Sequence, residues 1–144
     1  MKSSFLFSSG TNNTRLDFAI LILRFSAAGS MFYSHGLGKF QKLFSGESIQ
    51  FIDPFGIGMS ATFGLVIFAE FVCSAFVFFG LFTRFALIPL VINMGYIFFV
   101  YHKSHDFGDK EMALLFLSIF VALLLTGPGK HSFDRMILRR KNTV

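Results

Sequence analysis

Four apolar stretches, each long or nearly long enough to cross a membrane, dominate this sequence of 144 residues. They run over residues 16–36, 58–80, 85–101 and 112–127. A helix rises about 1.5 Å per residue, so about 20 apolar residues cross a hydrocarbon layer of about 30 Å. The last stretch is short, and either the neighbouring Lys110 and Glu111 or local thinning of the bilayer would complete it. The pattern predicts an all-α integral membrane four-helix bundle.

The low charge of the chain supports this prediction. Charged residues make up 15% of the sequence, and the mean hydropathy is +0.64, whereas soluble domains carry about 25% charged residues. So few charges exclude a soluble enzyme and a nucleic-acid-binding module, although the sequence pI is 9.7. The single cysteine, Cys73, excludes an intramolecular disulfide or a CxxC redox pair. The expected environment is therefore the lipid bilayer, with no nucleic acid as partner.

The distribution of lysine and arginine predicts the orientation. Four spans place both termini on one side, where eight of these cations lie, against four on the other side. The positive-inside rule then places both termini in the cytoplasm. We expect a cytoplasmic tail over residues 1–15, a transmembrane domain over 16–134 and a basic cytoplasmic tail over 135–144. The long connection 37–57 is expected to form an interfacial loop or short helix that covers the outer end of the bundle.

Ionisable side chains inside the predicted spans are costly in lipid and need partners. At about 100° per residue, Asp17, Arg24 and His35 share one face of the first helix. Glu70 of the second span falls at a similar depth to Arg24 when residues are counted from the inner ends. We therefore expect an Arg24–Glu70 ion pair and a second pair between Asp17 and Arg84. Such pairs serve either as scaffold or as a proton or anion site.

Histidines gather at the predicted outer ends of the spans, which leaves three interpretations open. The first is that these are polar residues at headgroup level with no special role. The second is a proton-handling or quinone-headgroup site on His35 and His102, because imidazole titrates near neutral pH and donates hydrogen bonds. The third is metal or haem ligation by His35 with His102 or His105. Asn93 and Tyr96 share a helix face and are expected to donate hydrogen bonds into the same interior.

The order of these motifs resembles that of the DoxX family of small four-span bacterial membrane proteins. The resemblance covers residues 16–134 and rests on six pieces of sequence: Leu23-Arg24-Phe25, Ser34-His35-Gly36-Leu37-Gly38-Lys39-Phe40, Ala69-Glu70-Phe71, Gly80-Leu81-Phe82-Thr83-Arg84, the loop around His102, and the segment from Leu125 to Asp134. It implies a location in the inner membrane and a link to redox physiology, since relatives are associated with quinone-coupled sulfur oxidation, quinone or catechol handling and oxidative-stress complexes. The family's arginine, glutamate and outer histidine correspond to Arg24, Glu70 and His35.

These observations lead to one functional hypothesis and several alternatives. The hypothesis is a redox-linked accessory subunit, a component of a membrane oxidoreductase, that binds a quinone or similar lipid-soluble ligand. Its expected contacts are Arg24, His35, Glu70, Asn93, Tyr96 and His102. The alternatives are a non-catalytic membrane scaffold, a small-solute transporter and a haem- or metal-binding protein. A membrane or periplasmic redox protein and a second copy of the chain are the expected protein partners.

Overall fold

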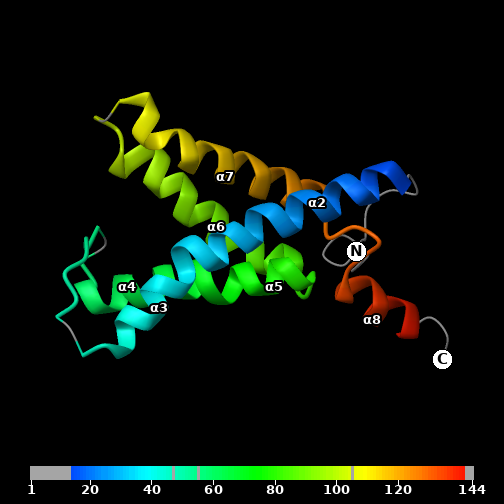
Figure 1. The fold of residues 1–144 in the computed structure, drawn as a ribbon, viewed down its shortest axis with the longest axis horizontal. Coiled ribbons are helices and arrows are strands. Elements are labelled where there is room, and N and C mark those ends of the chain that lie inside the picture. Colours follow the sequence, from blue (N-terminus) through cyan, green and yellow to red (C-terminus); the bar gives the residue numbers. More distant parts are fainter. Residues whose placement is uncertain (1–13, 47, 55, 105, 142–144) are drawn as a thin grey trace.

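The computed structural model describes residues 14–46, 48–54, 56–104 and 106–141. Within these residues all regular structure is helical, which confirms the predicted class. Four long helices run alongside one another, and a short helix follows the last of them (Figure 1). Three of the four are interrupted by a π-helical turn, which inserts one extra residue into the helix.

The helices are bounded as follows. The first long helix comprises α2 (Thr14–Ser30), η1 (Met31–Gly36) and α3 (Leu37–Phe44), and the second comprises α4 (Met59–Ile67), η2 (Phe68–Cys73) and α5 (Ser74–Phe79). The third comprises α6 (Thr83–Tyr96) and η3 (Ile97–Tyr101), the fourth is α7 (Phe107–Thr126), and the short helix is α8 (Phe133–Lys141).

Three of these helices are long and apolar enough to cross a membrane, namely Thr14–Phe44, Met59–Phe79 and Thr83–Tyr101. The expected fourth span corresponds to α7, which has 20 residues but carries Asp109, Lys110 and Glu111 near its start. α7 packs along α6 and α2. The first helix departs most from the prediction, because it continues without a break through residues 37–44, where a separate covering element was expected.

Apolar side chains fill the centre of the bundle. The fully buried residues come from all four long helices, and they include Ala28, Val77, Leu87, Leu90 and Phe120. Cys73 lies in the same core, as expected for a packing residue. This rigid centre separates the two ends of the molecule, each of which holds its own polar cluster.

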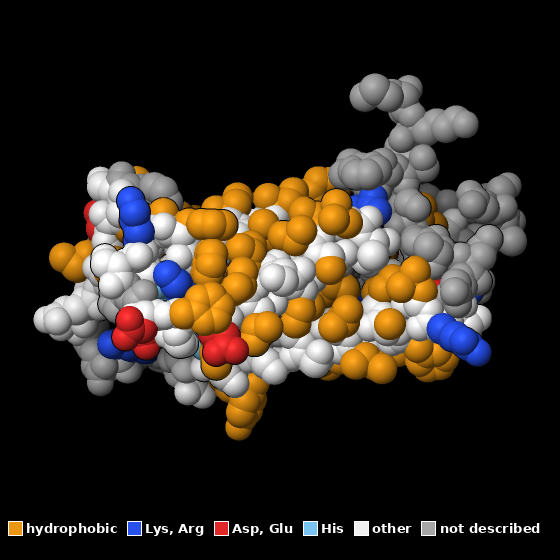
Figure 2. Space-filling view, turned by 90° about the horizontal axis from the view of Figure 1, so that it is seen from above, with side chains coloured by type: hydrophobic (Ala, Val, Ile, Leu, Met, Phe, Trp, Pro, Cys, Tyr) orange, Lys and Arg blue, Asp and Glu red, His pale blue; other side chains and the backbone are white. Residues whose placement is uncertain are grey.

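Large apolar side chains also cover the outside. Many of them are about half exposed or more, as at Phe18, Ile22 and Leu125. On the face shown in Figure 2, apolar side chains occupy the middle, and the charged side chains gather toward the two ends. An apolar belt between charged ends is the surface that a bilayer requires.

Candidate functional site

A cavity of about 630 Å³ opens among the first three long helices, at the end of the molecule where α3 and α4 lie. Volumes of this size are typical of small-molecule sites. The wall is formed by the first three long helices, by the connection between the first and second, and by His102 just after the third. The lining residues are Lys39, Gln50, Phe51, Ile52, Pro54, Thr62, Leu65, Val66, Phe68, Ala69, Glu70, Pro89, Ile92, Asn93, Tyr96, Ile97, Tyr101 and His102. Most of these side chains are apolar or aromatic, so the few charged and amide groups define the polar end of the cavity.

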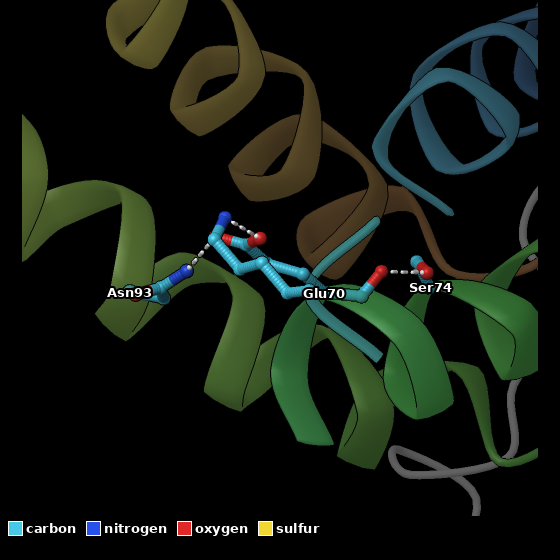
Figure 3. A network of polar contacts seen from close by, with 4 residues as sticks. Glu70, Ser74 and Asn93 are labelled. Atoms are coloured by element: carbon cyan, nitrogen blue, oxygen red, sulfur yellow. Dashed lines mark hydrogen bonds and ion pairs between the residues drawn. The ribbon is translucent and has the colours of Figure 1, made fainter. Parts of the chain in front are cut away.

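Glu70 is the centre of that polar end. Its side chain is 2% exposed. One carboxylate oxygen, Oε2, accepts a hydrogen bond from Lys39 Nζ, and the two groups form an ion pair. The other oxygen, Oε1, accepts a hydrogen bond of 2.9 Å from Asn93 Nδ2. Three helices therefore meet at one carboxylate, and Figure 3 shows the Glu70 side chain directed toward Asn93.

The π-helical turns position this cluster. Glu70 lies in η2, and its backbone carbonyl accepts a hydrogen bond from the Ser74 hydroxyl (Figure 3). η2 packs against η1 of the first helix. A Cβ atom at Gly36 would collide with the backbone of Glu70 and Phe71, so only glycine allows this approach. The close contact brings Lys39, one turn beyond Gly36, to the Glu70 carboxylate.

The connection between the first and second helices lines part of the cavity. Gln50, Phe51, Ile52 and Pro54 contribute to the wall from this segment. The Phe51 ring lies 5.1 Å from that of Phe63, measured between centroids.

Asp53 anchors this connection to the start of α4. Its carboxylate accepts hydrogen bonds from the backbone N–H of Ile57 (3.1 Å) and Gly58 (2.8 Å) and from the Thr62 hydroxyl (3.1 Å). The bond from Gly58 is the main reason that the pKa of Asp53 is lowered.

Arg24 lies at the opposite end of the molecule, away from the cavity. Its guanidinium is 1% exposed and donates hydrogen bonds of 2.5 Å to the carbonyl oxygens of Pro128 and His131. The predicted Arg24–Glu70 ion pair is therefore wrong. A buried guanidinium needs hydrogen-bond acceptors, and two backbone carbonyls of the segment after α7 supply them.

The error has a geometric cause. The prediction took the inner ends of the first two helices to lie at the same height. In the structure, Gly36 lies against Glu70, whereas a Cβ atom at Gly80 would lie 2.7 Å from the Arg24 guanidinium. Arg24 precedes Gly36 by 12 residues, which is about 18 Å along a helix. The residue at the height of Glu70 on the first helix is therefore Gly36.

The predicted Asp17–Arg84 pair is also wrong. Asp17 Oδ2 lies 3.0 Å from Lys130 Nζ, and Asp17 Oδ1 accepts a hydrogen bond of 3.1 Å from the Lys130 backbone N–H. The cation that pairs with Asp17 is therefore Lys130, on the segment after α7.

Asp134 holds the same segment to the turn between the second and third helices. It accepts hydrogen bonds from the backbone N–H groups of Phe82 (2.7 Å) and Thr83 (3.0 Å). Phe82 has a φ of 46°, a left-handed conformation that is rare for a bulky residue, and the Asp134 carboxylate stabilises it. Arg24, Asp17 and Asp134 therefore fix residues 127–134 against the bundle.

The predicted site residues divide into two groups. Glu70, Asn93, Tyr96 and His102 line the cavity together. His35 lies instead in a groove between the first helix and α7, where its ring lies 5.8 Å from that of Phe116.

The π-turn η1 explains the position of His35. The extra residue rotates the helix by about one position, so Gly36 becomes buried where His35 was expected to face inward. The same groove is lined by three serines of the first helix, which therefore lie on the side of His35: Ser26, Ser30 and Ser34.

The metal alternative gains no geometric support from the residues described. His35 and His102 line different cavities, and His105 lies outside the described residues. Among the described residues, no three histidine, cysteine, aspartate or glutamate side chains gather to hold a metal ion.

Lys39 is the site residue that the sequence reasoning missed. It was assigned to an interfacial segment, where a lysine reaches the headgroups. Its spacing was an unreliable signal, because Lys39 follows His35 by one helical turn, yet the two residues line different cavities in the structure. A longer first helix would have placed it inside the bundle.

Comparison with known proteins agrees with this architecture. The family model of DoxX matches residues 19–103, which include Lys39, Glu70 and Asn93. No curated protein matches the chain, and no solved structure does. The match covers more than half of the sequence and all of the cavity's polar end, and the helices are apolar enough to span a bilayer. The chain belongs to the DoxX family of membrane proteins.

Proposed function

We propose that this protein is a redox-linked accessory subunit of the bacterial inner membrane that binds a quinone or a similar aromatic, lipid-soluble ligand. The observation that carries the proposal is the cavity of about 630 Å³, whose wall is mostly apolar or aromatic and which holds the polar cluster of Lys39, Glu70 and Asn93. The size accommodates one aromatic ring and part of a tail. In this proposal all four long helices, α7 included, cross the bilayer, with both termini in the cytoplasm.

The hydrogen-bonding capacity of the cluster matches a carbonyl ligand. The Lys39 ammonium has three N–H donors, and Glu70 takes one of them. Lys39 lines the cavity, so in this proposal its remaining donors would bind an acceptor such as a quinone carbonyl. Because Lys39 and Glu70 balance each other's charge, the site favours a neutral ligand over an anion. The rings of Phe51, Phe68 and Tyr96 would enclose the ligand ring.

This proposal revises the expected contact set. Lys39 replaces Arg24 and His35, which lie outside the cavity, and joins Glu70, Asn93, Tyr96 and His102. Glu70 holds Lys39 in place and is the nearest carboxylate that would accept a proton from a bound hydroxyl group.

The test is a titration of the purified protein with a quinone that carries one isoprenoid unit. The amount of bound quinone and the melting temperature of the protein are measured at each concentration. We expect saturable binding, and Lys39→Met should weaken it about tenfold or more, the loss of one charge-assisted hydrogen bond. Lys42→Met is the matched control, because Lys42 is exposed on the same helix and does not line the cavity. Absence of binding by the unmodified protein would overturn the proposal and favour the scaffold alternative.

A further inference from the structure

Two of the membrane-capable helices expose part of the cavity wall. Leu65 and Phe68 of the second helix and Ile92 of the third line the cavity, yet they are 56%, 49% and 62% exposed. A side chain of a membrane-spanning helix that lines a cavity and is also exposed marks an opening toward lipid. These three residues are apolar and lie within the helices that are able to span a membrane. The opening therefore faces the acyl chains of the bilayer.

The connection between the first and second helices forms a cover at another part of the cavity. Gln50, Phe51 and Pro54 of this connection line the cavity, and Asp53 ties the connection to Gly58 and Thr62. Three hydrogen bonds to a single carboxylate hold this cover in one position. A ligand approaching from water would have to displace it, whereas one approaching from lipid meets only apolar side chains.

We propose that the ligand enters from the bilayer through a lateral portal between the second and third helices, bounded by Leu65, Phe68 and Ile92, and that it carries an apolar tail that stays in the portal. This inference rests on the proposed function for the identity of the ligand head. The polar cluster holds the head, and the portal holds the tail. The ligand class is therefore an amphipathic molecule with a carbonyl-bearing ring and a long hydrocarbon chain.

The chain contains no tryptophan, so a single introduced tryptophan reports on its own surroundings. Tyr96→Trp places this reporter in the cavity wall. In nanodiscs, phospholipids with brominated acyl chains quench a tryptophan that they contact, and iodide quenches one that water reaches. Ile22→Trp, at a residue that is 65% exposed on the outer belt, gives the upper limit of lipid quenching. Phe120→Trp, at a fully buried core residue, gives the lower limit.

We expect brominated lipid to quench Tyr96→Trp at least half as strongly as it quenches Ile22→Trp, and iodide to have little effect. Quenching no greater than that of Phe120→Trp, or stronger quenching by iodide than by lipid, would overturn the portal. If Tyr96→Trp does not fold, Val66→Trp tests the same wall, because Val66 also lines the cavity. The measurement needs no quinone, so failure of quinone binding and failure of the portal are distinguished.

Discussion

Replacing Arg24 with leucine tests the revised role of this residue. The guanidinium donates two hydrogen bonds, to the carbonyl oxygens of Pro128 and His131. Hydrogen bonds to charged groups contribute about 1.5–3 kcal/mol each. Arg24→Leu should therefore lower the free energy of unfolding by about 3–6 kcal/mol, because a buried and a partly buried carbonyl lose their charged donor. Arg24→Lys should lose less, since an ammonium retains the charge and one of the two bonds.

The assay is reversible unfolding in mixed micelles, followed by helical content. A double-mutant cycle of Arg24→Leu with Glu70→Leu distinguishes the observed arrangement, in which Arg24 binds backbone carbonyls, from an Arg24–Glu70 ion pair. The two side chains lie about 18 Å apart along the helix axis, so the coupling energy should stay below about 0.5 kcal/mol. A coupling energy well above about 1 kcal/mol would refute the reasoning, because separated residues do not couple so strongly.

Three further predictions concern other contacts. Gly36→Ala should destabilise the fold by about 1–3 kcal/mol in the same unfolding assay, because its Cβ collides with the Glu70 backbone, whereas Gly38→Ala, with open space around it, should not. Asp134→Ala should cost about 1–2 kcal/mol through loss of the cap on α6, and an unchanged unfolding midpoint would contradict this. The pKa of Asp53 is lower in the folded protein than in the unfolded chain, where it is about 3.9. The ionised Asp53 carboxylate therefore stabilises the fold at pH values above that unfolded pKa, and the stabilisation should be lost as the pH falls through the lower, folded pKa. Unfolding midpoints from pH 7 to 2 should therefore converge with those of Asp53→Ala, and parallel curves would count against this reading.

Hydropathy and helix length predicted much of the fold. The boundaries of the second and third helices agree with the predicted stretches within about two residues, since apolar runs end where polar or glycine residues begin. The first helix was predicted eight residues too short, because residues 37–57 were expected to form a separate interfacial segment. The wrong partner for Arg24 has another cause, since the depth count took the inner ends of the first two helices as level, whereas Arg24 lies beside Gly80 at the end of the second helix.

The site was harder to predict than the fold. Asn93 and Tyr96 were placed correctly on one face because they are three residues apart on a regular helix. His35 was misplaced because a π-turn has no clear sequence signal and shifts every later residue by one position. The partners of Arg24 are backbone carbonyls, which any residue can supply, so side-chain types could not identify them.

The central claim is that the cavity beside Lys39, Glu70 and Asn93 holds a lipid-soluble carbonyl ligand. Photolabelling of the protein in membranes with a photoreactive, isoprenoid-tailed quinone, followed by peptide mapping, tests it most directly. Labels should fall on residues 62–70 and 89–102, and Lys39→Met should reduce them. Labels that fall instead on the groove beside Ser30 and His35, or that Lys39→Met leaves unchanged, would contradict the account.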